Sequence, residues 1–412
     1  MSELIIQDAA LLDLESGEIV AGSSVRVSGE RIVEVAPGGR ITGDAPVLDA
    51  AGRTLMPGLI DAHVHAAVTT LDMPVMARRP ASRIGIEAAG LLEAMVRRGF
   101  TTVRDAGGLD RGVTDALDAG LVTGPRVFRS GRVISQTGGH GDFTEAGPGD
   151  PRLCACHIHS DWFAHVADGA DAVRRAVREE LKNGAHQIKI MASGGISSPT
   201  DPIDMVQYTH DEIRAATSEA AARGTYVLAH AFAPQAIVRA VTAGVKSIEH
   251  GFLLDAASAR VMAEHGSFLV PTLVVLEQLA EFGRRCNYPA ESLDKVHAVL
   301  TAGTNAVQVA LDAGVRVGFG TDLLGETHPA QGRELLLRAR VQSPLDVLRS
   351  ATTVNADLLG RSGELGTVAP GAFADLLLVS GNPLEDLSLL ADSGAGIDLV
   401  VRGGKAVHGE LS

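Results

Sequence analysis

The sequence is poor in aromatic residues, in cysteine and in long apolar stretches, and each shortage narrows the kind of protein it encodes. Aromatic residues make up 3% of the 412 residues, and there are three cysteines. Three is an odd number in a chain far too long to need disulfides for stability, so we expect a reduced, cytoplasmic protein. Residues 1–8 carry neither a basic leader nor an extended apolar core, which argues against a signal peptide.

Membrane and nucleic-acid partners are also disfavoured. No apolar run approaches the roughly 18 residues of a transmembrane helix, so we predict no membrane partner. The chain has 36 basic and 50 acidic residues, a net charge of -14, whereas a nucleic-acid partner would favour a basic face. What remains is an ordinary globular composition, 45% apolar and 21% charged, with 47 glycines that suit many tight turns between strands and helices.

Short strands are predicted at both ends of the chain. Residues 1–55 contain apolar or alternating runs between Gly, Ser and Asp breakers, with no helical periodicity. Residues 374–379 and 399–407 repeat this pattern, the second run with a Gly-Gly turn. We therefore predict one small β-sandwich domain that is assembled from residues 1–55 and 365–412.

The middle of the chain alternates strands with helices. Helical patterns such as Asp168–Asn183 and His210–Arg223 are followed by glycine, a common helix stop. Eight such units over roughly 300 residues predict an α/β fold, a (β/α)8 TIM barrel, over residues 56–364. An open doubly wound sheet is the alternative, but no Gly-x-Gly-x-x-Gly turn follows the first strand. The predicted strands are 58–65, 101–105, 126–130, 187–191, 226–230, 247–250, 268–272 and 315–322.

Polar side chains occupy the carboxyl ends of these strands, where TIM barrels carry their chemistry. Because alternate residues of a strand face the same way, the first two histidines converge. Taken singly, each residue has a structural explanation, such as a helix cap, a buried histidine or a lysine that extends to solvent. Together they form a donor set suited to Zn²⁺ or a similar ion. The residues are His63, His65, Lys189, His230, His250 and Asp322.

On these residues the sequence resembles the amidohydrolase superfamily of metal-dependent barrel hydrolases. The resemblance is carried by Met-Pro-Gly-Leu-Ile-Asp-Ala-His-Val-His at 56–65, by Lys189, and by the motifs at 229–230, 249–251 and 320–322. The run at 366–376 is equally typical of the family. The resemblance covers essentially the whole chain, including the β segments at both ends.

The resemblance implies a centre with two divalent metal ions, expected to be Zn²⁺. His63 and His65 would bind the more buried ion together with Asp322, and His230 and His250 the more exposed one. Lys189 would bridge the two ions as an N-carboxylated lysine, because an unmodified ammonium beside two cations is strongly disfavoured. A metal-bridging hydroxide would then attack a carbonyl, and Asp322 would pass its proton to the leaving amine.

The loops at 135–143 and 192–208 look like the branch of prolidase-like dipeptidases, carboxypeptidases and enzymes of N-acyl amino acids, including ochratoxin-type amides. By this resemblance His140 would bind the scissile carbonyl oxygen, although it could be a loop histidine in a glycine-rich turn. Tyr208 would contact the substrate carboxylate, although a tyrosine near a helix start often simply packs. Trp162 and Phe163 are candidates for contact with an apolar acyl group.

We therefore predict a zinc amidohydrolase that cleaves dipeptides or N-acyl amino acids and releases a C-terminal amino acid. Alternatives are a hydrolase of a non-peptide amide, phenylurea or carbamate, an imidazolonepropionase-like cyclic amidase, a deaminase, and an inactive scaffold. Lys189 argues against a deaminase, and retention of all six ligand positions argues against an inactive scaffold. The segment Cys154–His159 does not match a structural zinc pattern, so we expect a loop near the active site. We also expect a homo-oligomer.

Overall fold

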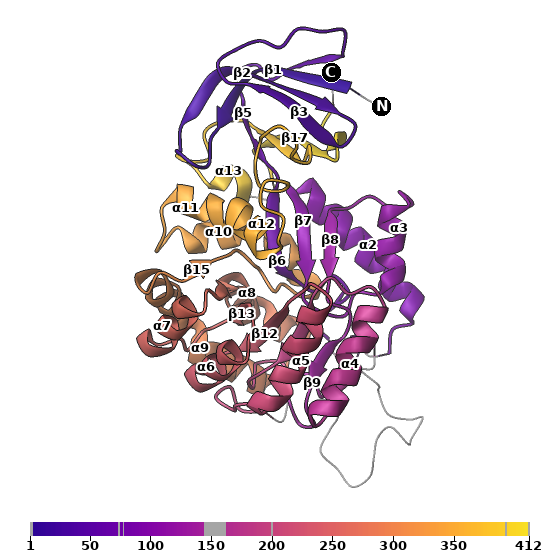
Figure 1. The fold of residues 1–412 in the computed structure, drawn as a ribbon, viewed down its shortest axis with the longest axis vertical. Coiled ribbons are helices and arrows are strands. Elements are labelled where there is room, and N and C mark those ends of the chain that lie inside the picture. The colour runs from indigo at the N-terminus through magenta and orange to yellow at the C-terminus, as the bar shows by residue number, and fades with distance from the viewer. Residues whose placement is uncertain are drawn as a thin grey trace.

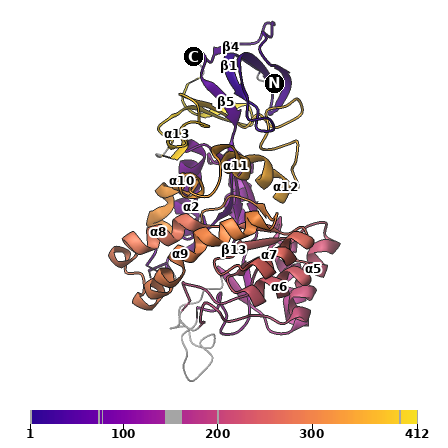
Figure 2. The same cartoon turned by 90° about the vertical axis from the view of Figure 1, so that its left-hand side faces the viewer.

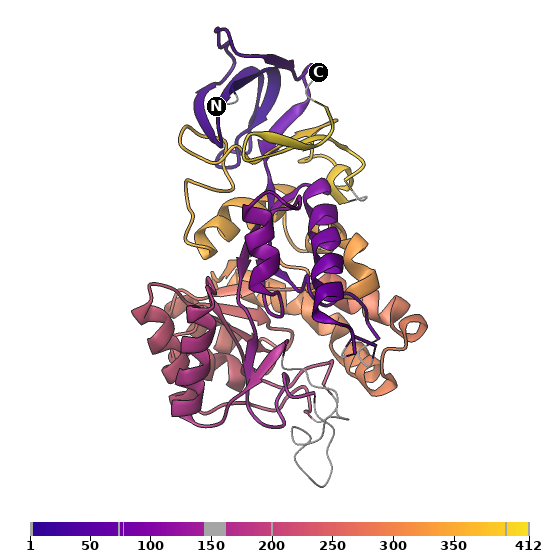
Figure 3. The ribbon, with the colours of Figure 1, turned by 90° about the vertical axis from the view of Figure 1, so that its right-hand side faces the viewer.

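Strands from both ends of the chain form a small β domain that sits on a larger α/β barrel (Figure 1). The computed structural model describes residues 3–72, 75–76, 78–143, 162–198, 201–391 and 394–410. Both chain ends lie in the β domain, and the two side views show the same division into two parts (Figures 2 and 3).

The sheet of the β domain combines sequences more than 300 residues apart. Its strands run in the order β18-β17-β16-β5-β1-β2-β3, with β4 paired to β1. The C-terminal hairpin turns at Gly403 and Gly404, both with positive φ, as the Gly-Gly motif predicts. The strands are β1 (Glu3–Leu12), β2 (Ile19–Ser28), β3 (Arg31–Ala36), β4 (Val47–Asp49), β5 (Thr54–Pro57), β16 (Leu376–Val379), β17 (Ile397–Arg402) and β18 (Lys405–His408).

The barrel strands are parallel, and each predicted strand is present. The third strand is interrupted, since β8 pairs with β7 whereas β9 pairs with β11. The barrel closes where Ala62 N donates to Phe319 O at 2.8 Å. The strands are β6 (Leu59–Val64), β7 (Phe100–Asp105), β8 (Arg126–Arg129), β9 (Val133–Ser135), β10 (Ala164–Val166), β11 (Ile188–Met191), β12 (Val227–Ala231), β13 (Ser247–His250), β14 (Phe268–Val270) and β15 (Arg316–Val317). The short strand β10, which the sequence did not predict, adds to β9.

Amphipathic helices cover the barrel. The predicted helices at 168–183 and 210–223 are α4 and α5, and Thr209 and Glu212 form a capping box at the start of α5. The helices and turns are α2 (Ala81–Arg97), α3 (Arg111–Asp118), α4 (Ala170–Lys182), α5 (His210–Ala222), α6 (Pro234–Thr242), α7 (Ala256–Glu264), α8 (Leu273–Phe282), η2 (Gly283–Cys286), α9 (Ala290–Asp312), η3 (Gly325–Ala330), α10 (Arg333–Arg338), α11 (Pro344–Arg349), η4 (Ser350–Val354), α12 (Asn355–Leu358) and α13 (Ser388–Ala391). Within the described ranges, no helix is both long enough and apolar enough to cross a bilayer.

The direction of the strands places the site. β6 starts two residues after β5 ends, so its amino end faces the β domain and its carboxyl end points away. Because the barrel strands are parallel, all their carboxyl ends meet at the far end of the barrel (Figure 1). The predicted TIM barrel with a small β domain is thus confirmed, and the chemistry is expected opposite that domain.

Candidate metal centre and active site

The two histidines of the first barrel strand converge on Asp322. His63 Nε2 lies 3.4 Å and His65 Nε2 3.3 Å from the same oxygen, Asp322 Oδ1. His63 is fully buried and His65 is 6% exposed. Asp322 follows the last barrel strand, so three groups from opposite ends of the barrel sequence meet at one point.

The hydrogen bonds of the two Nδ1 atoms determine which nitrogen of each ring faces Asp322. His63 Nδ1 lies 2.6 Å from Glu249 Oε2, and His65 Nδ1 lies 2.9 Å from the carbonyl oxygen of Gly107. Both partners accept hydrogen bonds, so each Nδ1 carries the proton in the neutral ring and each Nε2 presents a lone pair. His63 Nε2 is buried without a hydrogen-bond partner.

A cation resolves this arrangement. Two nitrogen lone pairs that face one carboxylate oxygen repel one another unless a positive charge lies between them. Ligand atoms of His63, His250 and Asp322 lie within 4.8 Å of one another, which suits a metal ion. The residues therefore fit the divalent metal that the sequence motifs imply.

The remaining predicted ligands lie around the same centre. The rings of His63 and His250 are 4.9 Å apart, and those of His230 and His250 are 4.7 Å apart. Burial lowers the pKa of both His230 and His250 well below the ordinary histidine value; the neighbouring His140 adds to the effect at His230, whereas Asp322 opposes it at His250. Neutral imidazoles are the form that binds metal.

Lys189 projects from β11 into the barrel and is 1% exposed. Burial lowers the pKa of its amine to about 8, although Glu249 and Asp322 nearby favour the charged form. Among the described residues, its Nζ has no hydrogen-bond partner within reach. Because its pKa is lowered, Lys189 is a neutral amine for more of the time than an exposed lysine is. Only the neutral amine can be carboxylated.

Two of the ligands have an unusual backbone. His250 has a φ of +71° and Asp322 a φ of +55°, in the left-handed region that non-glycine residues rarely adopt. Such conformations cost on the order of 1–3 kcal/mol and cluster at functional sites. Here they turn the two side chains into the barrel mouth at the ends of their strands.

A buried ion pair supports His63, and sequence reasoning gave it no role. Arg104 Nη2 lies 2.8 and 2.9 Å from the two oxygens of Glu249, and Arg104 Nε donates to the carbonyl of Ala62 at 2.5 Å. Glu249 in turn orients His63. Burial opposes ionisation of Glu249, but Arg104 and then His63 lower the pKa of this carboxyl below its usual range. In the sequence, this ion pair is indicated by charged residues at inward-facing positions of the barrel strands.

His140 lies against the predicted metal ligands, on the loop after β9. Its ring stacks on that of His230, with centroids 4.2 Å apart. His140 Nδ1 lies 2.7 Å from Ser198 Oγ and 3.3 Å from Asp201 Oδ2, while its backbone N donates to Gln207. These contacts hold the ring from one side and leave Nε2 for a group in the cavity. The motif at 192–202 is visible in the sequence, but its contact with His140 is not.

The cavity beside these ligands has about 70 Å³ of space and mostly apolar walls. His65, Lys189, His230, His250 and Asp322 line its floor together with His140. No arginine is among its described lining residues. The apolar part of the lining comprises Val68, Phe143, Phe163, Met191, Ile196, Phe232, Phe252, Val275, Leu279 and Leu324.

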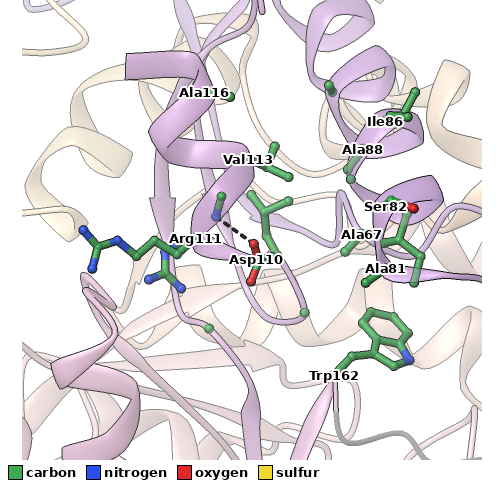
Figure 4. Close-up of a pocket in the computed structure, with 18 of the residues that line it drawn as sticks. Ala67, Ala81, Ser82, Ile86, Ala88, Asp110, Arg111, Val113, Ala116 and Trp162 are labelled. Carbon is green, nitrogen blue, oxygen red and sulfur yellow. Dashed lines mark hydrogen bonds between the residues drawn. The ribbon is translucent and has the colours of Figure 1, made fainter. Parts of the chain in front are cut away.

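Two aromatic candidates lie elsewhere. Tyr208 is 3% exposed, and its hydroxyl donates to the carbonyl of Ala167 at 2.9 Å, so the structure does not bring it into the cavity. A φ of +57° turns it towards the core. Phe163 lines the cavity as expected, but Trp162 lines a separate space of about 840 Å³ between α2 and α3, where it lies below Ala81 (Figure 4). None of the six predicted ligands lines that larger space. The segment Cys154–His159 lies outside the described residues.

Comparisons by sequence match nearly the whole chain to known proteins. The sequence model of the amidohydrolase family matches residues 54–407. Ochratoxinase from Aspergillus niger is 35% identical over 373 residues, a match that covers 86% of this chain and 76% of the ochratoxinase.

Solved structures extend the likeness to three dimensions. A prolidase in complex with N-methylphosphonate-L-proline is 47% identical, with a TM-score of 0.96, and the match covers 99% of this chain and 100% of the prolidase. A Xaa-Pro dipeptidase with methionine bound in its active site is 30% identical, with a TM-score of 0.88 and coverage of 99% and 100%. The likeness therefore spans both the barrel and the β domain.

Proposed function

We propose that this chain, which belongs to the amidohydrolase family, releases a C-terminal amino acid from dipeptides or N-acyl amino acids. The family and the branch expected from the sequence motifs are confirmed, and the chain is a hydrolase of amide or peptide C–N bonds. The proposal adds the substrate class and a two-metal mechanism. The observation that carries it is the meeting of His65, His230, His250, Asp322 and Lys189 on the floor of one apolar cavity, with His63 buried beside Asp322.

In the proposed centre His63, His65 and Asp322 would hold one divalent ion, and His230 and His250 would hold a second. Carboxylated Lys189 would supply further oxygen ligands. When bound, such ions polarise a carbonyl and lower the pKa of a water molecule towards neutrality. Zinc is the proposed metal because the donors are imidazole nitrogens and carboxylate oxygens.

The protein's own groups then complete the reaction. Asp322 lies on the cavity floor, where it accepts the proton of the attacking water and returns it to the leaving amine. His140 lies beside His230 on the same floor, where its Nε2 donates to the oxygen of the scissile carbonyl. The apolar walls take up the acyl group or the side chain of the released residue.

Prolidase and ochratoxinase, as named relatives, support this substrate class. A second candidate is a hydrolase of a phenylurea, a carbamate or another non-peptide amide. It is favoured by the lack of an arginine among the described lining residues, since a substrate carboxylate has no evident cationic partner there.

A substrate screen distinguishes the two candidates. Xaa-Pro dipeptides, other dipeptides and N-acyl amino acids are tested beside phenylureas and carbamates, with release of the amino acid or amine measured. We expect the highest kcat/KM for a substrate with a free C-terminal carboxylate. A clear preference for the same amide without that carboxylate would overturn the proposal.

Metal analysis tests the two-ion centre. We expect about two divalent ions per chain by mass spectrometry of the purified protein, and a mass increase of Lys189 that matches one carbon dioxide in the intact protein. Lys189→Ala should reduce the metal content. A single tightly bound ion in the wild-type protein, with Lys189 unmodified, would contradict the two-metal arrangement.

His140 gives a further prediction. His140→Ala should lower kcat by about 100-fold or more, the range reported for loss of one donor to a developing oxyanion, with metal content unchanged. His140→Gln, which keeps a donor, should recover part of the activity. If metal content falls with kcat, His140 is a ligand and not a donor to the substrate.

A further inference from the structure

A second cavity, of about 560 Å³, lies at the end of the barrel opposite the metal centre. Its walls come from the β domain (β3 and β17), from α3 and β8 of the barrel, and from the loops at 184–186 and 361–373, elements that meet where the two parts join (Figure 1). We call it the interdomain cavity. None of the proposed metal ligands lines it.

Arginine dominates the lining of the interdomain cavity. Six arginines face three carboxylates, although the chain as a whole carries a net charge of -14. A local excess of guanidinium groups over carboxylates in the lining favours the binding of anions. The arginines are Arg31, Arg111, Arg126, Arg129, Arg361 and Arg402, and the carboxylates are Asp115, Asp118 and Glu364.

Half of these arginines already have a carboxylate partner. Arg111 pairs with Asp115 at 3.2 Å and Arg361 pairs with Glu364 at 3.2 Å, both on the exposed rim. Arg126 pairs with Asp375 at 2.8 Å. These pairs fix the outer edge of the cavity and one side of its wall.

The other three lack an ion pair with any described residue. Arg31 donates to the carbonyl of Gly371 at 2.9 Å, and Arg129 donates to the carbonyl of Asn183. Arg402 is half-buried, and its Nε is buried without a hydrogen-bond partner among the described residues. Burial, and then the charge of Arg126, lower the pKa of Arg402, yet the group stays a cation at neutral pH. Asp375 and Glu30 lie near enough to favour the charged form of Arg402, but neither forms an ion pair with it, so a further anion would offset the remaining cost of burying this charge.

Aromatic rings hold the guanidinium planes in place. The ring of Phe373 lies between Arg31 and Arg126, whose Cζ atoms are 3.5 and 3.6 Å from its centroid. Phe128 packs edge-on against His186 on the opposite wall. Stacked guanidinium groups keep their N–H edges free, and those edges match the oxygens of a phosphate group.

We propose that the interdomain cavity binds a small phosphate-bearing anion, either free phosphate or a phosphate ester, through Arg402 and Arg31. The bound anion neutralises cations from the β domain and from the barrel at once. It therefore stabilises the junction between the two parts, remote from the catalytic centre, and the site is independent of the proposed substrate.

Binding to the full-length protein tests this proposal. Inorganic phosphate is titrated by isothermal calorimetry at constant ionic strength, with AMP as a phosphate ester in a second series. We expect a saturable site, and we expect the melting temperature to rise with phosphate beyond that in matched chloride. Arg402→Gln and Arg31→Gln should each weaken phosphate binding by about tenfold or more.

Arg340→Gln is the matched control, since Arg340 is exposed on the barrel and does not line the interdomain cavity. It should bind phosphate like the wild type. Tighter binding of AMP than of phosphate, lost in Arg402→Gln, assigns the site to an ester, and equal affinities assign it to the free anion. Unchanged phosphate binding in both Arg402→Gln and Arg31→Gln would overturn the proposal, since phosphate would then occupy the metal centre only. The absence of binding above the chloride control would also overturn it.

Discussion

Gly195 leaves room for the ring of His140 and for nothing more. A Cβ added at Gly195 would lie 2.2 Å from His140 Cε1 and 2.5 Å from each ring nitrogen. The backbone of Gly195 is also held, because its N donates to Asp201 at 3.1 Å and its carbonyl accepts from Lys295 at 2.9 Å. The ring must therefore yield if the residue is enlarged.

Gly195→Ala should therefore displace His140 and lower kcat by about 100-fold, with the fold and metal content retained. The measurement is steady-state kinetics beside metal analysis. Gly90→Ala is the control, because Gly90 lies in α2 with nothing near the added methyl group, and it should leave kcat unchanged. Equal kcat in the two variants would show that the position of His140 does not matter.

Glu334 on α10 is a buried carboxyl with a raised pKa. One of its oxygens accepts from Val274 N at 2.7 Å, and the other is buried without a partner. Burial raises the pKa of Glu334 to about 8, although Arg338 opposes this. An unfolded glutamate has a pKa near 4.5, so between these values the folded state holds a proton that the unfolded state has lost.

The free energy of unfolding should therefore fall as pH rises from about 4.5 to 8, with the contribution of Glu334 complete below this window and absent above it. Glu334→Gln removes the titration. Urea unfolding at pH 5.5 and at pH 8.5 measures the free energy of unfolding of both proteins. The difference between variant and wild type should shift in favour of the variant by on the order of 1–3 kcal/mol from the lower to the higher pH. The exposed Glu264→Gln should show no such gain, and parallel pH profiles for wild type and Glu334→Gln would contradict the assignment.

The side chain of Asn355 contributes to the closure of the barrel. Asn355, at the start of α12, donates to the carbonyls of Ile60 and Phe319 at 2.7 and 2.8 Å and accepts from Phe319 N at 3.1 Å. It therefore joins the first strand to the segment after the last one, where β15 has only two residues.

Asn355→Ala should cost about 3 kcal/mol, because it leaves buried backbone groups without partners. Chemical denaturation measures the loss, and Asn305→Ala on the exposed face of α9 provides the comparison with little or no effect. A cost below about 0.5 kcal/mol would mean that the barrel closes without this bridge.

The elements were largely predictable, and the reason is physical. Strands that are buried on both faces read as mainly apolar runs, so β6 and β12 stand out in the sequence. β10 did not, because a three-residue strand has no periodicity to detect. The interruption between β8 and β9 was also missed, since it depends on the left-handed Gly131, with φ of +74°.

The site was predictable only in part. The ligand positions follow from strand ends, but the partners that orient them do not, because Arg104 and Glu249 are 145 residues apart in sequence. Tyr208 was placed in the site by the resemblance of its segment to the prolidase-like branch. Its backbone conformation, which no local pattern indicates, turns it to the core instead.

For the whole molecule, metal should act as a structural clamp. The proposed ligands come from β6, β11, β12, β13 and the segment after β15, so bound ions link opposite sides of the barrel. Removal of metal by a chelator should lower the melting temperature, and added Zn²⁺ should restore it. Each site contributes about 4 kcal/mol when free metal exceeds Kd a thousandfold. A melting temperature that is insensitive to the chelator, in a protein shown to have lost its metal, would contradict this coupling.

The sheet of the β domain also dictates an order of events during synthesis. β5 pairs on one side with β1 and on the other with β16, which begins 319 residues after β5 ends. The entire barrel sequence must therefore be synthesised before β16 can pair with β5. Until then the edge of β5 that will pair with β16 is unpaired. Unrelated strands can pair with such an open edge. Early occupation of that edge, for example by a chaperone, would help the newborn chain to reach its native state.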